Sequence, residues 1–294
     1  MPGPRRRWLT VRVTRTEPSA PADRPGRFAA VRARLGADLV PAPPTGVPPR
    51  VLRDEVLLLL AVSILASAIY AALSLARRLL APGGLRASQA TLNGSYAPDQ
   101  PWLDLLFQLV NVGLGVVPAL LALHLLARDR IPPRQLGVDG TRPRSDLLRG
   151  MLLAAVIGLP GLLLYLAAHA LGLSATIVPS ALPDEWWRVP VLVLSALMNS
   201  TLEEVVVVGY LITRLRQLGR GPAVAVGIAA LLRGAYHLYQ GFGGFLGNTV
   251  MGVVFGWFFL RTGRVMPLIV AHALLDVVAF VGYTALSGSV SWLP

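Results

Sequence analysis

The sequence predicts an all-α, polytopic integral membrane protein with about seven transmembrane helices. Of its 294 residues, 54% are hydrophobic and only 14% are charged, and the mean hydropathy is +0.60. The apolar residues form long runs, whereas a soluble fold of this size would show amphipathic stripes and could not bury so much apolar surface. Cysteine is absent, which excludes disulfides, thiolate metal ligands and thiol nucleophiles.

The first segment, residues 1–53, is polar and rich in Arg, Pro and Ala. It contains no apolar stretch long enough to form the core of a signal peptide. Its composition is typical of chains that cannot bury a hydrophobic core. We therefore expect a disordered extension on the cytoplasmic side of the membrane.

Seven apolar segments follow this extension. Because about 20 apolar residues cross a bilayer, the sixth segment is short for a complete crossing. Pro118 and Pro160 lie inside the second and third segments and are expected to kink them. The predicted spans are 55–76, 102–127, 147–171, 189–212, 222–240, 247–260 and 265–285. We group them as three N-terminal spans within 54–186 and a functional core within 187–285, followed by a tail at 286–294.

The net charge of +12 comes entirely from arginine, because the chain has no lysine. Arginines gather in the extension and in the connections 128–146, 213–221 and 261–264, whereas the connection 241–246 is uncharged. This is the distribution of charge that sets membrane topology, and it predicts a cytoplasmic N-terminus and an external C-terminus. Only the arginines after the first span break the pattern. We expect anionic lipid as a partner, and no nucleic acid.

Ionisable residues also occur inside three of the last four spans, where lipid disfavours them. A charge at the bilayer centre costs about 2.5–3.5 kcal/mol on insertion scales, so these side chains are expected to pair with one another. They are Glu203 and Glu204 in the fourth span, Arg233 and His237 in the fifth, and His272 and Asp276 in the seventh.

Helix geometry predicts which of these groups meet. His272 and Asp276 are four residues apart and therefore share one helix face. If the fourth and fifth spans run antiparallel around their short connection, Glu203 or Glu204 lies level with His237, about 23 Å from that turn. The sequence thus predicts a carboxylate facing an imidazole inside the membrane.

Such a group of residues is suited to hydrolysis. A carboxylate can take a proton from water, and an imidazole can position that water or protonate the leaving amine. His237 and His272, with Glu203 or Glu204, also match the ligand shell of a divalent metal such as zinc. Three carboxylates and one arginine leave a charge of −2, which a metal ion, protonated histidines or a protonated carboxyl would each balance. The sequence leaves the choice open.

These motifs carry a resemblance to a known family. Glu203-Glu204, then His237 after 33 residues, then the His-x-x-x-Asp motif of His272 and Asp276 resemble the CAAX-protease and bacteriocin-processing (CPBP, or Abi) intramembrane endopeptidases. The motifs of that family are EExxxR, FxxxH and HxxxN or HxxxD. The resemblance covers about 199–280. It implies an all-helical core in which these five residues are catalytic, with a glutamate-activated water that hydrolyses a peptide or protein substrate at the membrane.

Two positions depart from the family pattern. The arginine expected four residues after the second glutamate is Val208, and the aromatic residue expected four before the first histidine is Arg233. We predict that Arg233 contacts Glu204 bidentately from the neighbouring helix and replaces the missing arginine. The alternative is that Arg233 pairs with another polar group, such as Tyr70 or Asn248.

The two adjacent acids point about 100° apart on a helix, so one is expected to act as the base and the other to brace the site. We favour Glu203 as the base. Asn199, one turn before Glu203, and Asn248 in the sixth span are expected to support the site. His124 and His169 receive no role.

Two other functions fit the same residues. A buried chain of Glu, His and Asp also serves as a proton relay in transporters, although no internal repeat is evident here. The loss of the family arginine at Val208 also suits a catalytically inactive scaffold or immunity protein. The arginine-only, Ala-, Pro- and Gly-rich composition indicates a bacterial plasma membrane. The sequence does not indicate the substrate or the oligomeric state.

Overall fold

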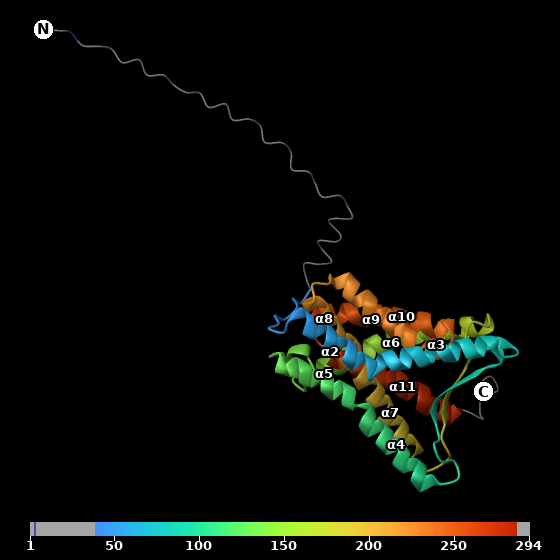
Figure 1. The fold of residues 1–294 in the computed structure, drawn as a ribbon. Coiled ribbons are helices and arrows are strands. Elements are labelled where there is room, and N and C mark those ends of the chain that lie inside the picture. The colour runs from blue at the N-terminus through green and yellow to red at the C-terminus, as the bar shows by residue number, and fades with distance from the viewer. Residues whose placement is uncertain (1–2, 4–38, 287–294) are drawn as a thin grey trace. The chain divides into compact units, whose positions relative to one another are not determined.

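The computed structural model of the protein describes residues 39–286, together with Gly3 (Figure 1). This part of the chain is almost entirely helical, which confirms the predicted all-α class. Its strands are β1 (Gln89–Gly94) and β2 (Thr176–Ala181), which form a parallel pair. Residues 1–2 and 4–38 of the predicted extension and residues 287–294 of the predicted tail lie outside the described residues.

Several helices begin at a proline, where the missing N–H and the fixed φ angle favour a helix start. Proline is the first residue of α2, α4, α6 and α9. The α-helices of the described residues are α2 (Pro49–Ala61), α3 (Ile64–Leu80), α4 (Pro101–Gly115), α5 (Val117–Arg128), α6 (Pro143–Ala170), α7 (Arg188–Glu203), α8 (Ile212–Gln217), α9 (Pro222–Tyr236), α10 (Phe242–Thr262) and α11 (Met266–Leu286). A π-helix, η3 (Glu204–Leu211), joins α7 to α8, and the 3₁₀ helices are η1 (Gly84–Ala87), η2 (Pro133–Leu136) and η4 (Leu238–Gln240).

Most of the predicted spans correspond to helices that are long and apolar enough to cross a membrane. In the described part of the chain these are Pro101–Arg128, Pro143–Ala170, Arg188–Gln217, Phe242–Thr262 and Met266–Leu286. The pair α2 and α3, bent by 49°, adds a sixth crossing if it forms one span. The helix α9 is apolar but has 15 residues. The structure therefore supports a polytopic membrane protein with five or six crossings, and the seventh remains a prediction.

Two predicted spans differ in length from the helices observed. The sixth, predicted as the short segment 247–260, is the 21-residue helix α10. The fifth, predicted to reach residue 240, ends at Tyr236. After η4 the chain turns at Gly241, which adopts a φ of 103°, and a Cβ at this glycine would lie 2.7 Å from the carbonyl oxygen of Leu173. The turn places His237 at the end of a helix.

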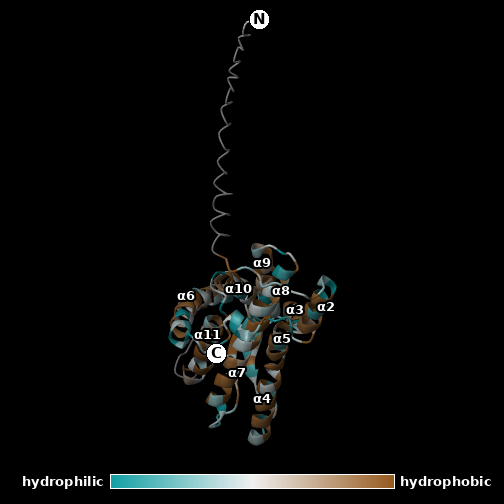
Figure 2. Cartoon of the chain, turned by 90° about the vertical axis from the view of Figure 1, so that its left-hand side faces the viewer, coloured by the Kyte–Doolittle hydropathy of each residue, from teal (hydrophilic) through white to brown (hydrophobic). Residues whose placement is uncertain are grey.

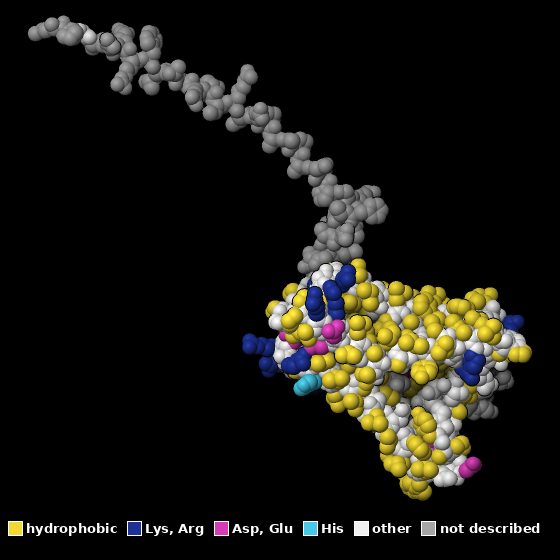
Figure 3. All heavy atoms as spheres, viewed as in Figure 1, with side chains coloured by type: hydrophobic (Ala, Val, Ile, Leu, Met, Phe, Trp, Pro, Cys, Tyr) yellow, Lys and Arg dark blue, Asp and Glu magenta, His cyan; other side chains and the backbone are white. Residues whose placement is uncertain are grey.

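The outer surface of the helices is apolar, as a lipid-facing surface requires. On α6, for example, Leu152, Leu159 and Leu163 are each at least 66% exposed. Figure 3 shows hydrophobic side chains over most of the visible face, with charged side chains gathered mainly near the end that holds α8 and the start of α2. The hydropathy colouring agrees, because the helices in Figure 2 are mainly brown and white.

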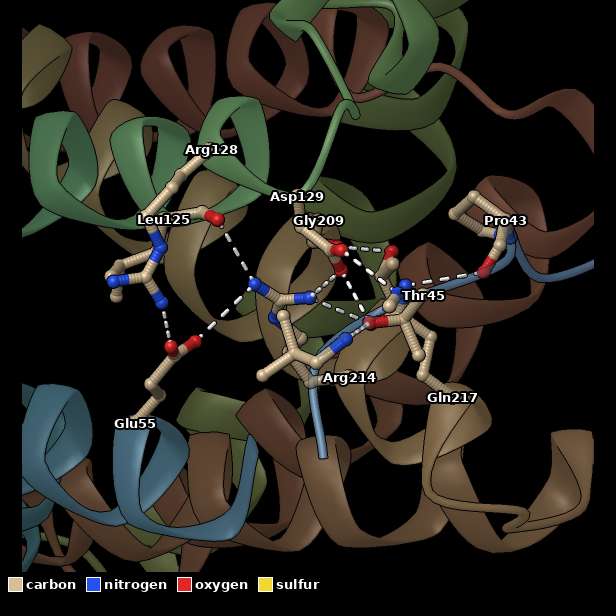
Figure 4. Close-up of polar contacts among 12 residues, drawn as sticks. Pro43, Thr45, Glu55, Leu125, Arg128, Asp129, Gly209, Arg214 and Gln217 are labelled. Carbon is tan, nitrogen blue, oxygen red and sulfur yellow. Dashed lines mark hydrogen bonds and ion pairs between the residues drawn. The ribbon is translucent and has the colours of Figure 1, made fainter. Parts of the chain in front are cut away.

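A buried network of charges lies at this polar end, between α2, α5 and α8 (Figure 4). Arg214 of α8 is completely buried and donates to the Asp129 carboxylate at 2.7 Å and to the Gln217 side-chain oxygen at 2.9 Å. It also donates to the Leu125 carbonyl at 3.1 Å and lies 3.4 Å from the Glu55 carboxylate. The network joins α2, α5 and α8. The helix α8 follows η3, which begins at Glu204.

Residues 39–47, just before α2, pack against the same end of the molecule. The Thr45 hydroxyl donates to Asp129 at 2.6 Å, and the Val40 N–H donates to the Leu260 carbonyl at 2.7 Å. The last part of the predicted extension is therefore bound to the helices. The predicted boundary after residue 53 falls inside α2.

A second ion-pair cluster fixes the turn between α10 and α11. Arg264 donates through Nε and Nη2 to the two oxygens of Asp146, at 2.9 and 2.6 Å, and through Nη2 to Asp139 at 3.1 Å. The hydrogen bonds from Arg264 hold the pKa of Asp139 well below its usual range. The cluster positions the start of the helix that carries His272.

Because Arg214 is completely buried, we expect that removal of its side chain destabilises the protein. We expect Arg214→Ala to lower the free energy of unfolding by about 3 kcal/mol, the low end of the range for breaking a buried ion pair, because each acid keeps another polar partner. Equilibrium unfolding in detergent micelles measures the change. Arg220→Ala, at an exposed arginine in the next turn, is the matched control. Equal stability of the two variants would show that the network is not stabilising.

Membrane orientation is tested by reporter fusions. Fusions after residues 50, 138, 217 and 263 are expected to report the cytoplasm, and a fusion after residue 294 the opposite side, because arginine-rich connections stay inside. Paired phosphatase and fluorescent-protein reporters distinguish the two sides. A cytoplasmic C-terminus would contradict a seven-span topology.

Candidate active site

The ionisable residues of the core meet where α7 continues into η3 and packs against α9 and α11. Glu203 is the last residue of α7, and Glu204 is the first residue of η3. Small residues bring α10 close to α9 beside this site. A Cβ at Gly252 would lie 2.8 Å from the Cα of Ala230 and 3.3 Å from the Arg233 side chain. Glycine at this position therefore leaves room for a buried arginine.

Arg233 lies at the centre of the site and is completely buried. Its Nη2 donates to Glu204 Oε1 at 2.6 Å and to Glu203 Oε2 at 3.2 Å, and it lies 3.0 Å from Nδ1 of His272. The predicted contact between Arg233 and Glu204 is therefore present. It is made by one nitrogen and not bidentately, and Nε and Nη1 have no partner among the described residues.

The two glutamates have different environments. The Glu204 side chain is 0% exposed; its Oε1 meets both Arg233 and His272, and its Oε2 is buried without a partner. The Glu203 side chain is 13% exposed, and its Oε2 accepts the Tyr236 hydroxyl at 2.7 Å. Within residues 39–286, no hydrogen bond reaches Glu203 Oε1. Glu203 is thus the acid with an oxygen open to a reactant, and Glu204 is the acid held inside the protein.

His272 lies between Glu204 and Asp276. Its Nδ1 lies 2.8 Å from Glu204 Oε1, and its Nε2 lies 3.7 Å from Asp276 Oδ1. A guanidinium only donates and a carboxylate only accepts, so a proton on Nδ1 satisfies Glu204 but not Arg233. The predicted shared face of His272 and Asp276 is present, at a distance beyond a direct hydrogen bond. Asn199, which we expected to support the site, lies near Asp276.

His237 is the first residue after α9 and is only half-buried. Its Nδ1 lies 2.9 Å from the Arg233 carbonyl oxygen. A carbonyl only accepts, so Nδ1 carries the proton, and in the neutral ring Nε2 keeps its lone pair. The charge of Glu203 acts on His237, and no hydrogen bond joins the two side chains in the described structure. The carboxylate–imidazole contact predicted for α9 is made instead by His272 of α11.

The structure adds one residue to the site and leaves one out. Tyr236 contacts Glu203, and the sequence reasoning missed it, although it lies three residues after Arg233 and therefore on the same helix face. Asn248, which we expected to support the site, donates to the Gly244 carbonyl of its own helix at 3.0 Å.

The donor atoms of Glu203, Glu204 and His272 lie within 4.8 Å of one another and would suit a metal ion by chemical type. Arg233 Nη2, however, lies within hydrogen-bond distance of all three. A guanidinium and a divalent cation repel each other, so this arrangement pairs the acids with arginine and leaves no place for an ion. His237, predicted as a metal ligand with His272, lies outside this group.

A cavity of about 490 Å³ borders the residue before Glu203. It lies between the bend of the α2–α3 pair and α4, and its wall includes Ser63, Phe107, Leu114 and Leu202. Its volume falls within the range of about 300–1,000 Å³ for ligand sites.

The fold and the site define a polytopic helical membrane protein with a cluster of acids, histidines and one arginine buried between its helices. Residues 185–278 match the family model described as Type II CAAX prenyl endopeptidase Rce1-like. This match contains every residue of the candidate site and confirms the resemblance to CAAX proteases over that part of the chain; the first three spans lie outside it. No curated protein and no solved structure matches the chain.

Proposed function

We propose that the protein is an intramembrane endopeptidase that hydrolyses a peptide bond with water activated by Glu203. The observation that carries the proposal is the asymmetry of the glutamate pair. Glu203 has one oxygen held by Tyr236 and Arg233 and one oxygen without a donor among the described residues. A carboxylate fixed in this way can accept a proton from water on its open side.

The reaction follows from these positions. Glu203 Oε1 takes a proton from water, and the water oxygen bonds to the carbonyl carbon of the substrate while the carbonyl π electrons move to its oxygen. The tetrahedral intermediate then expels the amine, which receives the proton from Glu203. His237 presents Nε2 as an acceptor that can orient the water.

Glu204, Arg233 and His272 hold the site together and do not exchange protons with the substrate. Arg233 offsets part of the negative charge of the two glutamates, and so allows Glu203 to remain ionised in a buried environment. His272 fixes Glu204 from the opposite helix, with Asp276 behind it. In this proposal Arg233 supplies, from α9, the positive charge that the family pattern places at position 208.

The substrate that we propose is a peptide or protein segment reached at the membrane, because the site is embedded between spans and an apolar cavity borders Leu202. The organism is proposed to be a bacterium, with the protein in its plasma membrane.

Cleavage of membrane-embedded peptides by the purified protein in liposomes tests the proposal. Mass spectrometry is expected to find discrete peptide products with the wild type and none with Glu203→Gln. Proton flux in the same liposomes without cleavage would support the transporter, and neither activity would support the inactive scaffold.

A further inference from the structure

Tyr236 is a buried aromatic residue with its polar end in the site. Its side chain lies on α9, and the residue is 6% exposed. The hydroxyl donates to Glu203 Oε2 at 2.7 Å, a normal length for a strong O–H···O hydrogen bond to a carboxylate. Its ring packs against the His237 imidazole with the ring centroids 4.7 Å apart. One side chain thus touches both the acid and the imidazole that would face the reacting water.

The position of the hydroxyl decides which oxygen of Glu203 is open. Oε2 receives Tyr236 at 2.7 Å and the more distant Arg233 at 3.2 Å. Arg233 shares the same nitrogen with Glu204 at 2.6 Å, so Glu203 receives only its weaker contact. The Tyr236 hydroxyl is therefore the main group that prevents the Glu203 carboxylate from rotating.

We propose that Tyr236 is a positioning residue for hydrolysis, which holds Glu203 by Oε2 so that Oε1 faces the water. This inference rests on the proposed function and assigns a role to a residue outside the motifs that identified the site. Tyr236 does not contact the substrate in this account and acts only through Glu203 and the adjacent ring of His237.

The test compares Tyr236→Phe with Tyr239→Phe, each of which removes one hydroxyl from the same short segment. The Tyr239 hydroxyl accepts the Gln240 amide at 3.0 Å and contacts no carboxylate of the site. We expect Tyr236→Phe to lower kcat about 10- to 100-fold, the loss typical of a hydrogen bond to a charged group. KM should change less than about twofold, because the hydroxyl acts after binding. Tyr239→Phe should match the wild type in both constants.

A double-mutant cycle shows whether Tyr236 acts through Glu203. The shorter side chain of Glu203→Asp retains a carboxylate but withdraws it from the hydroxyl. If the two residues act as a unit, Tyr236→Phe causes little further loss in the Glu203→Asp background. The proposal would be overturned if the kcat loss of the double variant equalled the product of the two single losses. A wild-type kcat in Tyr236→Phe would overturn it as well.

An infrared measurement tests the contact without a substrate. The difference spectrum between the wild type and Glu203→Gln identifies the carboxylate band of Glu203. Tyr236→Phe should shift this band and Tyr239→Phe should not; an unmoved band would overturn the inference. A wild-type protein without peptidase activity would instead overturn the proposed function, so the two failures are distinguishable.

Discussion

Glu203→Gln, His237→Ala and His272→Ala are each expected to lower peptide hydrolysis by about 10³-fold or more, because each removes a member of a group that acts as a unit. The reasons differ. Glutamine keeps the shape of Glu203 and can still accept the Tyr236 hydroxyl, but it cannot take a proton from water. The loss of His237 removes the free Nε2, and the loss of His272 removes the partner that holds Glu204 from α11.

Initial rates with a confirmed peptide substrate measure these losses, and the amount of folded protein extracted from the membrane is measured in parallel. His124→Ala is the matched control, because this histidine is exposed on α5 and receives no role. Wild-type cleavage by the triple variant would contradict the assignment of the site.

Arg233→Ala is expected to abolish activity and to destabilise the protein by about 3–5 kcal/mol, the cost of leaving a buried charge without its partner. Arg233 is the only arginine within hydrogen-bond distance of Glu204 in the described structure, and it also reaches Glu203 and His272. The change removes the permanent positive charge beside two adjacent acids in an apolar environment.

Adding Val208→Arg to Arg233→Ala should restore part of the activity and stability. Position 208 lies on η3, four residues after Glu204, and is 1% exposed, so an arginine placed there remains among the spans near the acids. Activity and thermal unfolding of both variants are compared in detergent. A double variant no better than Arg233→Ala, or normal activity of Arg233→Ala alone, would contradict the compensation.

The helical fold was predictable because lipid forces the backbone to satisfy its own hydrogen bonds, so each long apolar run becomes a helix. Features that depend on distant contacts were not. The pair β1–β2 joins Gln89 to Thr176, residues with no local signal for pairing. The break between α2 and α3 lies at Ser63, whose hydroxyl bonds to the Leu59 carbonyl. A serine alone does not indicate a 49° bend.

The candidate site was predictable where charge left few alternatives. A glutamate pair in hydrocarbon requires a cation, and Arg233 on the antiparallel neighbour was the nearest one by depth. The partners of the glutamates other than Arg233 were not predictable, because the π-helix η3 begins at Glu204 and turns differently from an α-helix. The sequence predicted a contact between His237 and a glutamate. In the structure Tyr236 contacts Glu203, and His272 contacts Glu204.

The proposed function requires that Glu203 activates water for peptide hydrolysis. The decisive measurement is single-turnover cleavage of a membrane-embedded peptide in ¹⁸O-labelled water by reconstituted wild type and Glu203→Gln, with mass spectrometry of the products. We predict that the wild type places one ¹⁸O atom in the new carboxyl group of the product and that Glu203→Gln yields no product. Equal cleavage by the two proteins, or a product without the label, would contradict the account.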